Sequence, residues 1–281
     1  MQKRISVVIV NYNRPLEVKG AVQSLLNQSM EPFEIIIIDD ASKSPLTMKM
    51  NDSKIKLIRF DKEVGLSAAR NYGISIARGE YVAFMDDDAM ASKQWIEEIL
   101  NGIMAGGEIL GGPLRPIFRA NPPKWWNEKD LGYFVGVGNS EKREIWGANM
   151  VFKKEVFQKV GVFNPNIGRQ KGKLLAFEDS NLISRAEKSF KLLFLPNAKV
   201  FHLVSSQRLT LRYIIRWSYN HGKSQRIELG SNKLIVARWR VGAFPLFFKA
   251  MIKLLDPFTK STKSTRILQV ATMAESIGII I

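Results

Sequence analysis

The stretch GLSAARNYGISIARGEYVAFMDDDA, residues 65–89, places a helix pattern, a strand pattern and an acidic end in direct succession. Gly65 opens the helix pattern, and we expect Gly79 to cap its carboxyl end. Tyr81–Met85 is an apolar run typical of a strand buried on both faces. It ends in three consecutive aspartates at 86–88. The order predicts part of a parallel sheet with acidic groups at a strand end.

The residues before this stretch show the same alternation. Ile5–Val10 and Phe33–Ile38 are buried-strand patterns, and Ile55–Phe60 is a weaker one. Between the first two, residues 16–28 carry apolar side chains at a helical period. Strands and helices that alternate at this spacing predict an α/β fold with a Rossmann-like, mostly parallel central sheet flanked by helices.

Composition sets limits on the class of protein. With 281 residues and 46% apolar residues, the chain is globular rather than disordered, and the absence of cysteine excludes a disulfide scaffold, a thiolate metal site and a cysteine nucleophile. The net charge of +16 is uneven, because residues 200–281 hold 13 of the 42 basic residues but only 3 of the 26 acidic ones. Nucleic acid, an anionic membrane surface and phosphorylated small molecules all remain open as partners.

Polar residues follow three of the predicted strands. They are Asn11-Tyr12-Asn13-Arg14, Asp39-Asp40-Ala41-Ser42 and Asp86-Asp87-Asp88. A single acidic strand end is most often a turn or a helix cap, but three adjacent carboxylates repel one another unless a cation or basic groups offset them. The carboxyl ends of parallel strands are where such sheets bind ligands, and carboxylate oxygens suit Mg²⁺ or Mn²⁺ together with substrate phosphates.

Missing motifs narrow the choice further. There is no GxGxxG after the first strand and no GxxxxGK[ST], so neither a dinucleotide fold nor a phosphate-loop NTPase is supported. A sugar-1-phosphate nucleotidyltransferase stays as an alternative, although the segment NYNRPLE at 11–17 is not the glycine-rich basic loop expected for it. A non-catalytic protein that binds polyanions or glycans is the other alternative. No RNA-binding or helix-turn-helix signature is present, so we do not expect nucleic acid.

Five segments, taken in order, resemble the nucleotide-sugar domain of family-2 glycosyltransferases. They are SVVIVNYNRP (6–15), FEIIIIDDAS (33–42), the stretch at 65–89, IWGANMVFKKEVFQKVGVFNPNIGR (145–169) and LLAFEDSNLISRAEKSF (174–190). The resemblance implies a GT-A fold and inverting, metal-dependent transfer of a sugar from a nucleoside-diphosphate donor, with UDP favoured over GDP and dTDP. No QxxRW motif follows, which favours a non-processive enzyme.

The resemblance also implies which residues meet the donor. Tyr12 would stack on the nucleobase, Asp40 would accept a hydrogen bond from the base or ribose, and Arg70 would reach the base or the diphosphate. Arg208 is a candidate for the diphosphate. The full set implied for the nucleotide sugar is Asn11, Tyr12, Asn13, Arg14, Asp40, Arg70, Asp86, Asp87, Gly147, Ala148, Asn149 and Arg208.

The aspartates at 86–88 match the family's DxD motif. Asp86 would face the ribose, Asp88 would hold Mn²⁺ or Mg²⁺, and the side chain of Asp87 should point elsewhere. His202 follows the predicted strand PNAKVF, where a histidine would complete the metal site. The metal ligands implied by the resemblance are therefore Asp88, Asp86 and His202, although a lone histidine is as often structural.

The pair Glu178-Asp179 matches the position of the family's general base. Asp179 would take the proton of the acceptor hydroxyl, and Glu178 would orient it or contact the acceptor. Without the resemblance, the same pair would be the acidic start of an amphipathic helix. Gly147 would allow the backbone to approach the donor sugar closely.

Domain limits and surroundings complete the sequence-based predictions. We expect a catalytic domain over 1–225, with a donor half at 1–110 and an acceptor half at 111–225, and a basic helical tail over 226–281. The tryptophans Trp125, Trp126 and Trp146 would either stack on sugar rings or pack a loop. We expect His221 at the surface.

The tail suggests where the protein works. Aromatic residues and lysines at helical spacing around 244–255 indicate a helix that lies on a membrane surface through 234–281, or that packs on the catalytic domain or a second subunit. We therefore expect a cytoplasmic enzyme at the inner face of the membrane. It would serve envelope polysaccharide or glycoconjugate synthesis with a glycan, lipid-linked or protein acceptor, and a homo-oligomer remains open.

Overall fold

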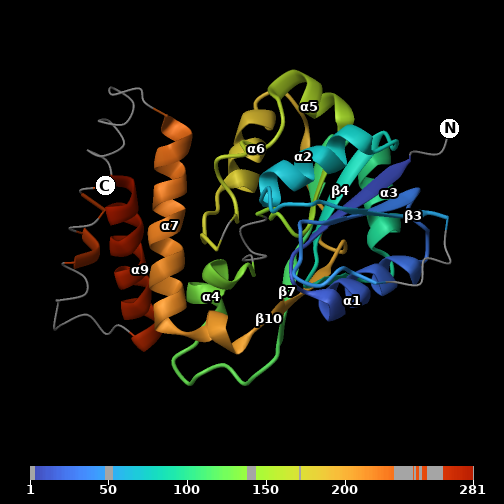
Figure 1. Cartoon of the computed structure of the whole chain (residues 1–281). Helices are drawn as coiled ribbons and strands as arrows, with labels where there is room; N and C mark the ends of the chain where they lie inside the picture. Colours follow the sequence, from blue (N-terminus) through green and yellow to red (C-terminus); the bar gives the residue numbers. More distant parts are fainter. Residues whose placement is uncertain are drawn as a thin grey trace. The chain divides into compact units, whose positions relative to one another are not determined.

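The computed structural model describes residues 4–47, 53–137, 144–170, 172–230, 243, 245–246, 249–251 and 262–280. The chain divides into two compact units, each assembled from segments that are far apart in sequence (Figure 1). Unit 1 comprises Met1–Ile117, Gly138–Pro165 and Glu178–Leu203. Unit 2 comprises Phe118–Val137, Asn166–Phe177 and Val204–Ile281.

Unit 1 is built on a seven-stranded sheet with the order β3-β2-β1-β4-β8-β6-β9. The strands are β1 Ile5–Asn11, β2 Glu34–Asp39, β3 Ile55–Arg59, β4 Tyr81–Asp86, β6 Ile109–Gly111, β8 Met150–Lys153 and β9 Leu192–Phe194. The first four pair in parallel, whereas β8 runs antiparallel to β4 and β6. A second sheet has the order β5-β10-β7, with β5 Ala89–Ala91, β7 Leu114–Phe118 and β10 Val200–Val204.

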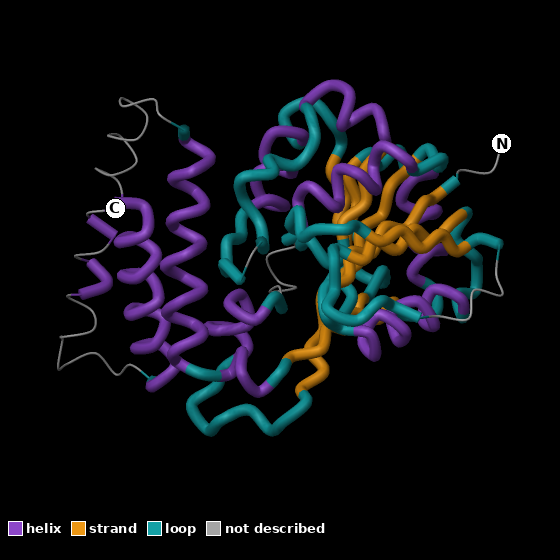
Figure 2. The backbone as a smooth tube through the Cα atoms, viewed as in Figure 1, coloured by secondary structure: helices purple, strands orange, loops and turns teal. Residues whose placement is uncertain are grey.

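Helices cover both faces of the large sheet (Figure 2). They are α1 Pro15–Leu26, α2 Leu66–Ile76, α3 Trp95–Met104, α5 Lys154–Val160 and α6 Glu178–Ala186. On β1, Val7 and Ile9 pack with α1 and α3, whereas Val8 packs with α2, α5 and α6. Successive side chains of a strand point to opposite faces, so a strand with helices on both sides needs an unbroken apolar run. The predicted α/β fold with a mostly parallel sheet is confirmed.

One detail of the prediction is wrong. Helix α2 ends at Ile76 with Ala77 as its C-cap, so Gly79 does not cap it. Gly79 instead passes close to β1, where its backbone N–H donates to Ser6 Oγ at 2.8 Å. A Cβ atom at this position would lie 2.7 Å from the Ser6 nitrogen, so close backbone approach is the reason for this glycine.

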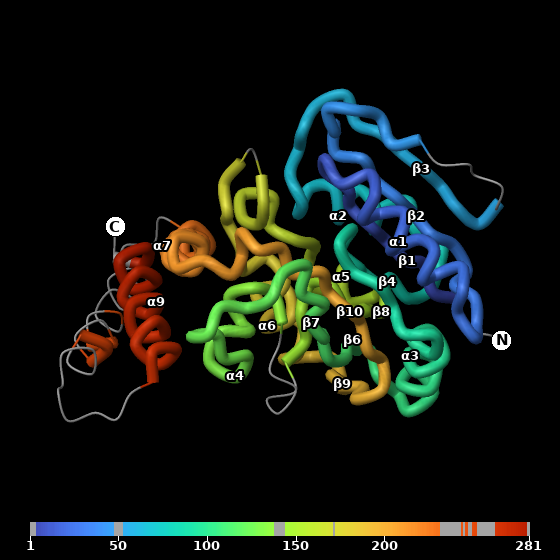
Figure 3. Tube along the Cα trace, turned by 90° about the horizontal axis from the view of Figure 1, so that it is seen from below, coloured from blue at the N-terminus to red at the C-terminus, as the bar shows by residue number. Residues whose placement is uncertain are grey.

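The described part of unit 2 is mostly helical. The elements named there are α4 Glu128–Leu131, the 3₁₀ turns η1 Gly132–Val135 and η3 Ser206–Leu209, and the helices α7 Leu211–Leu229 and α9 Lys263–Ile280. The two long helices lie side by side (Figure 3). Two glycines allow their backbones to come close, because a Cβ on Gly222 would lie 2.0 Å from the Glu275 carbonyl oxygen and one on Gly278 would lie 2.1 Å from that of Tyr219.

The prediction that His221 lies at the surface is wrong. This side chain is buried in unit 2, with Nδ1 2.9 Å from Glu275 Oε1 and Nε2 3.1 Å from the Tyr133 hydroxyl. Its ring also stacks on Trp217. Glu275 belongs to α9, which is distant in sequence from His221. The polar residues around His221 therefore suggested exposure to solvent and gave no sign that a second helix covers this side chain.

The tail is described only in part. Residues 231–242, 244, 247–248, 252–261 and 281 lie outside the described residues, so the predicted surface helix around 244–255 stays a prediction. The same holds for the domain limit at 225, through which α7 runs without a break. Within the described ranges, no helix combines the length and the apolarity that crossing a bilayer requires.

The two faces of the sheet give a matched test of helix packing. A Cβ on Gly73 of α2 would lie 2.5 Å from Val8 Cγ1, whereas one on Gly20 of α1 would meet only the Met90 sulfur at 3.8 Å. We expect Gly73→Ala to lower the free energy of unfolding by about 1–3 kcal/mol, because the stiff valine on β1 must move. Gly20→Ala should raise it by about 0.5–1 kcal/mol. Denaturant unfolding of both variants checks this, and equal signs would contradict it.

Candidate active site

Three candidate cation ligands meet at the carboxyl end of β4 in unit 1. Asp86 ends β4, and Asp88 lies just before β5. Strand β10 pairs antiparallel with β5, which sets His202 opposite Ala89, and the Leu203 N–H donates to the Asp88 carbonyl oxygen at 2.8 Å. One ligand atom from each of Asp86, Asp88 and His202 lies within 4.8 Å of the others.

The spacing of these atoms fits a divalent cation. Asp88 Oδ1 lies 3.2 Å from His202 Nε2. Two ligand atoms at right angles on a six-coordinate ion, each about 2.1 Å from it, lie about 3 Å apart. Two carboxylates and an imidazole are also a suitable donor set for Mn²⁺. The two acidic ligands and the histidine thus have both the geometry and the chemistry of a divalent cation site.

The middle aspartate has a different environment. Asp87 is buried, and its Oδ2 accepts the backbone N–H of Tyr12 at 3.3 Å while its Oδ1 lies 2.7 Å from Arg14 Nη1. The same Arg14 nitrogen lies 2.8 Å from Asp88 Oδ2. Burial raises the pKa of Asp87 to about 7, although the Arg14 charge opposes this shift. The Asp87 side chain is therefore engaged with the loop after β1.

A buried arginine connects the cation cluster with the start of α6. Arg70 of α2 is 3% exposed, with Nη2 3.0 Å from Asp86 Oδ1 and Nη1 3.0 Å from Glu178 Oε1. It also donates to the Gly147 carbonyl oxygen at 3.4 Å and lies over two buried phenylalanine rings. A guanidinium held on both sides in this way brings the end of β4 and the first residue of α6 into one site.

Asp179 is fixed by backbone groups. Its Oδ2 accepts the N–H of Gly147 at 2.8 Å, and its Oδ1 accepts the N–H of Ser180 at 2.7 Å. A Cβ on Gly147 would lie 3.0 Å from Asp179 Oδ2 and 3.1 Å from Arg70 Nη2, so any other residue here would have to displace these two side chains. Burial, followed by the Asp179 charge, raises the pKa of the neighbouring Glu178 to about 7. Asp179 itself is only half-buried.

The backbone is strained at three places that border these residues. The non-glycine residues with positive φ in the described part of the chain are Asn13 at 57°, Ala41 at 57° and Phe177 at 82°. Asn13 follows β1, Ala41 follows β2, and Phe177 directly precedes Glu178. Asn tolerates this conformation, whereas Ala and Phe rarely adopt it, and such strain concentrates at functional sites. Two of these positions lie in the loops that follow β1 and β2, and the third directly precedes α6.

Two of the predicted donor residues contact the segment before α2. The Tyr12 ring is 41% exposed, and a hydrogen bond from its hydroxyl to Glu63 raises its pKa. Asp40 is buried, and its two oxygens accept the N–H groups of Val64 and Gly65 at 2.8 and 2.9 Å. Burial raises the pKa of Asp40. An exposed aromatic ring beside a fixed carboxylate offers a planar heterocycle a face on which to stack.

A comparison with protein families now decides the assignment. The family model described as Glycosyl transferase family 2 matches residues 6–161, which is more than half of the chain. The chain belongs to glycosyl transferase family 2. Its enzyme class is therefore a glycosyltransferase, and the resemblance found in the sequence is confirmed.

Individual relatives agree with the family. The glycosyltransferase is 35% identical over 235 residues to the "Uncharacterized glycosyltransferase YwdF" of Bacillus subtilis strain 168, covering 78% of this chain and 84% of the relative. It is 26% identical over 241 residues to the "Glucosyl-dolichyl phosphate glucuronosyltransferase" of Haloferax volcanii, covering 80% and 77% of the two chains.

Solved structures agree on the fold. S. aureus TarS matches with a TM-score of 0.56 at 15% identity, over 87% of this chain and 43% of TarS. Its piece 1–349 matches with a TM-score of 0.55 at 14% identity, over 97% and 90%. At this level of identity the likeness shows the fold alone, which is the expected GT-A fold.

Some of the predicted donor residues of this glycosyltransferase are engaged within the protein. Asn11 is buried and donates from Nδ2 to Asp39 Oδ1 and to Ser42 Oγ, both at 3.2 Å. Asn13 donates its backbone N–H to the same hydroxyl at 2.8 Å and accepts the N–H of Lys43 at 2.8 Å. These residues join the ends of β1 and β2, and their contact with a donor stays a prediction.

The side chains that follow Gly147 in its turn are buried in the protein. Asn149 is fully buried, with Oδ1 accepting from Trp95 Nε1 at 2.8 Å and Nδ2 donating to the Ala198 carbonyl oxygen at 2.8 Å. Ala148 is also buried. The Asn149 amide therefore holds the turn in place, and contact of this segment with the donor sugar stays a prediction.

Other predicted residues lie in unit 2 or in a core. Arg208 belongs to unit 2, where it is buried and donates to the Val135 carbonyl oxygen at 3.4 Å. Trp125 and Trp126 pack against the core of unit 2, and Trp146 packs against the core of unit 1. Their packing agrees with the loop-packing interpretation, and a role in diphosphate or sugar binding stays a prediction.

Sequence reasoning missed two side chains near the site. Glu63 holds the Tyr12 hydroxyl, and Arg59 Nη1 pairs with the fully buried Asp39 while its Nη2 donates to the Ser42 carbonyl oxygen at 2.8 Å. Arg59 lies directly opposite Asp39 in the β2–β3 register. The sequence does show a charged residue, Arg59, at the end of a predicted strand. Its partner Asp39 could be identified only from the register between β2 and β3.

The buried carboxylate of Glu178 predicts a pH-dependent stability. Its pKa rises from 4.5 to about 7 on folding, so the folded state keeps a proton that the unfolded chain releases, and stability falls as pH rises across that window. Asp179, Asp86 and Arg70 are the charges that act on it. We expect Glu178→Gln to flatten this fall by on the order of 2 kcal/mol.

Denaturant unfolding at about pH 5 and about pH 8 measures the effect. The exposed Glu187, which follows α6, provides the control as Glu187→Gln and should leave the pH slope as in the parent protein. Equal slopes for Glu178→Gln and the parent would contradict the prediction.

Proposed function

We propose that this glycosyltransferase transfers a sugar from a nucleoside-diphosphate donor, with UDP favoured, to a glycan or lipid-linked acceptor with inversion at the anomeric carbon. The observation that carries the proposal is the position of Arg70. Its guanidinium is 3.0 Å from a candidate cation ligand, Asp86, and 3.0 Å from Glu178 beside the candidate base. Arg70 thus joins the place where a diphosphate leaving group would be activated to the place where an acceptor would lose its proton.

The donor would bind along the carboxyl ends of β1, β2 and β4. The exposed Tyr12 ring offers a stacking surface for the base, and Asp40 is held in place beside it by the two backbone N–H groups before α2. Asp86, Asp88 and His202 would hold Mn²⁺ or Mg²⁺ next to the diphosphate. When bound, the cation supplies positive charge that stabilises the departing diphosphate.

Asp179 suits the role of general base better than Glu178. Glu178 is 7% exposed and faces Arg70, whereas Asp179 is half-buried and held by the N–H groups of Gly147 and Ser180. A carboxylate fixed by backbone donors keeps one orientation as the acceptor hydroxyl approaches. Removal of the proton as this oxygen attacks opposite the leaving group gives the inverted product.

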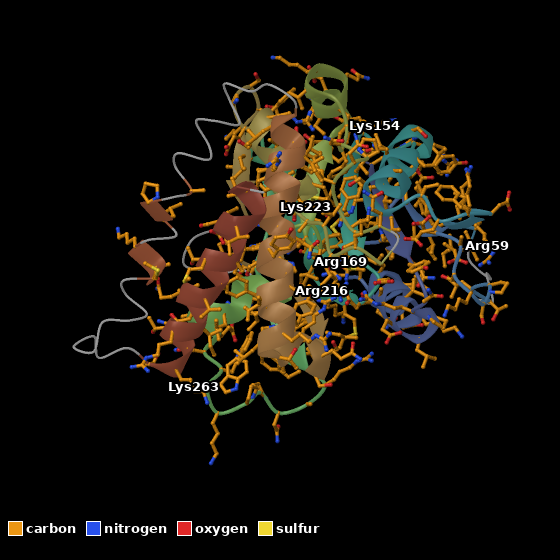
Figure 4. All side chains as sticks on the ribbon, turned by 60° about the vertical axis from the view of Figure 1, so that its left-hand side comes forward. Arg59, Lys154, Arg169, Arg216, Lys223 and Lys263 are labelled. Carbon is orange, nitrogen blue, oxygen red and sulfur yellow. The ribbon has the colours of Figure 1, made fainter. Side chains whose placement is uncertain are left out.

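The nature of the acceptor is supported by a relative and by charge. The H. volcanii relative is named for a dolichyl phosphate substrate, which favours a lipid-linked acceptor here. Basic side chains on unit 2 include Arg216 and Lys223 on α7 and Lys263 at the start of α9 (Figure 4). Such residues favour an anionic surface, so we place the enzyme at the inner face of a membrane, with 234–281 in contact with lipid.

If Asp179 is the general base, its replacement should lower the rate of transfer without weakening donor binding. Asp179→Asn keeps the size of the side chain but removes the proton acceptor, so transfer should fall by a factor of about 10²–10⁴. Donor affinity should change by less than about threefold, because the residue is proposed to act on the acceptor. Turnover and nucleotide-sugar titration measure the two effects, with Glu187→Gln as the control. Loss of donor affinity in Asp179→Asn would contradict the assignment.

The cation assignment predicts metal-dependent nucleotide binding. In a thermal-shift screen of nucleoside diphosphates and their sugars, Mn²⁺ should increase the stabilisation by the preferred nucleotide, because only the native state binds it. Asp88→Asn should abolish this increase, whereas Asp61→Asn, at an exposed aspartate outside the cluster, should keep it. A parent protein that binds no nucleotide with Mn²⁺ would contradict the proposed function itself.

A further inference from the structure

The middle residue of the acidic triplet has a role that the cation cluster does not explain. Asp87 is 5% exposed, yet it is not among the three candidate ligands. Its Oδ2 accepts the Tyr12 N–H at 3.3 Å, and its Oδ1 lies 2.7 Å from Arg14 Nη1. A buried carboxylate with both oxygens directed at the loop after β1 is an anchor for that loop.

The arginine in this contact also reaches a candidate ligand. Arg14 Nη1 lies 2.8 Å from Asp88 Oδ2, while the other oxygen of Asp88 lies 3.2 Å from His202 Nε2. One guanidinium nitrogen thus bridges two successive carboxylates and leaves Asp88 Oδ1 directed toward the histidine. Arg70 makes a similar contact with the other acidic ligand, Asp86, at 3.0 Å.

We propose that Arg14 and Asp87 form a clamp that positions Asp88 for the divalent cation, so that both are positioning residues. The inference rests on the cation in the proposed function. It also replaces the donor contact that the sequence suggested for these two residues. The clamp runs from the Tyr12 backbone through Asp87 and Arg14 to Asp88, in an unbroken series of contacts no longer than 3.3 Å.

Physical chemistry supports a positioning role over competition with the cation. A carboxylate that rotates freely loses orientational entropy when it binds an ion, and partners behind a metal ligand reduce this loss. A lone arginine beside the site would repel the cation. Arg14 Nη1, however, lies 2.7 Å from Asp87 Oδ1 and 2.8 Å from Asp88 Oδ2, so acidic groups on both sides offset its positive field while it orients Asp88.

The test is a Mn²⁺ titration of the full chain, with free Mn²⁺ followed by its electron paramagnetic resonance signal, with and without UDP. We expect Arg14→Gln and Asp87→Asn each to weaken Mn²⁺ binding by about 10–100-fold, the range seen when partners of metal ligands are removed. Arg14→Lys should recover part of the loss. Arg78→Gln removes an equal charge from another pair of an arginine with a buried carboxylate, Arg78 with Glu34 at the start of β2, and should change the affinity by less than about twofold.

The double variant Arg14→Gln/Asp87→Asn separates a clamp from two independent effects. Residues that act as one unit give a double variant no weaker than the weaker single variant, whereas independent contributions multiply. Arg14→Gln leaves the buried Asp87 carboxylate without its arginine and can for that reason fail to fold. Asp87→Asn and the double variant carry no charge at residue 87, so they can still be measured in that case. The clamp then predicts equally weak Mn²⁺ binding by these two.

Several outcomes would overturn the inference. Unchanged or tighter Mn²⁺ binding in Arg14→Gln would mean that Arg14 is passive or competes with the cation, and multiplying losses would reject a shared role. Weaker UDP binding by Arg14→Gln in EDTA would return Arg14 to the donor site. In each of these cases the parent protein still binds Mn²⁺ with UDP, so the proposed function stands. A parent protein without Mn²⁺ binding would instead reject the cation, and the clamp with it.

Discussion

The burial of the Arg70 guanidinium is the constraint on which the site depends. A buried charge is costly unless it is paired and hydrogen-bonded, and removal of one partner leaves the other uncompensated. Arg70 therefore requires Asp86, Glu178 and the Gly147 carbonyl oxygen together. These groups belong to the end of β4, the start of α6 and the turn before β8. Pairing of one side chain thus fixes the relative positions of three elements of unit 1.

Charge balance explains why the acidic triplet and the acidic start of α6 coexist. The region holds five carboxylates, which belong to Asp86, Asp87, Asp88, Glu178 and Asp179. Two arginines, Arg14 and Arg70, contact the first four of them. Five acidic groups against two guanidinium groups leave an excess of negative charge when all are ionised. Burial first, and the neighbouring carboxylates second, raise the pKa values of Asp87 and Glu178. A divalent cation would compensate the same excess, as expected for a donor site that must also accept a diphosphate.

Sequence reasoning succeeded where local pattern determines structure. The Phe33–Ile38 run predicted a strand buried on both faces; the strand begins one residue later, at Glu34, and the side chains of Ile35–Ile38 are all fully buried. It failed where a contact depends on distant pairing. The site of His202 depends on the antiparallel register of β10 with β5, and Arg59 meets Asp39 only through the register of β2 with β3. His221 was wrongly placed at the surface because its partner, Glu275, arrives from α9.

The loops with positive φ angles explain why the backbone of the candidate site cannot be predicted from the conformational preferences of its residues. Asn13, Ala41 and Phe177 all adopt positive φ angles; Asn tolerates this region, whereas Ala and Phe disfavour it, so local preference predicts a different backbone at Ala41 and Phe177. The surrounding structure must therefore impose them. Asn13 is held by Ser42, whose hydroxyl contacts the buried Asp39, so the conformation of the loop after β1 depends on the fully buried end of β2. The geometry of the candidate donor site is in this sense set by the sheet core, and catalytic precision and fold stability rest on the same contacts.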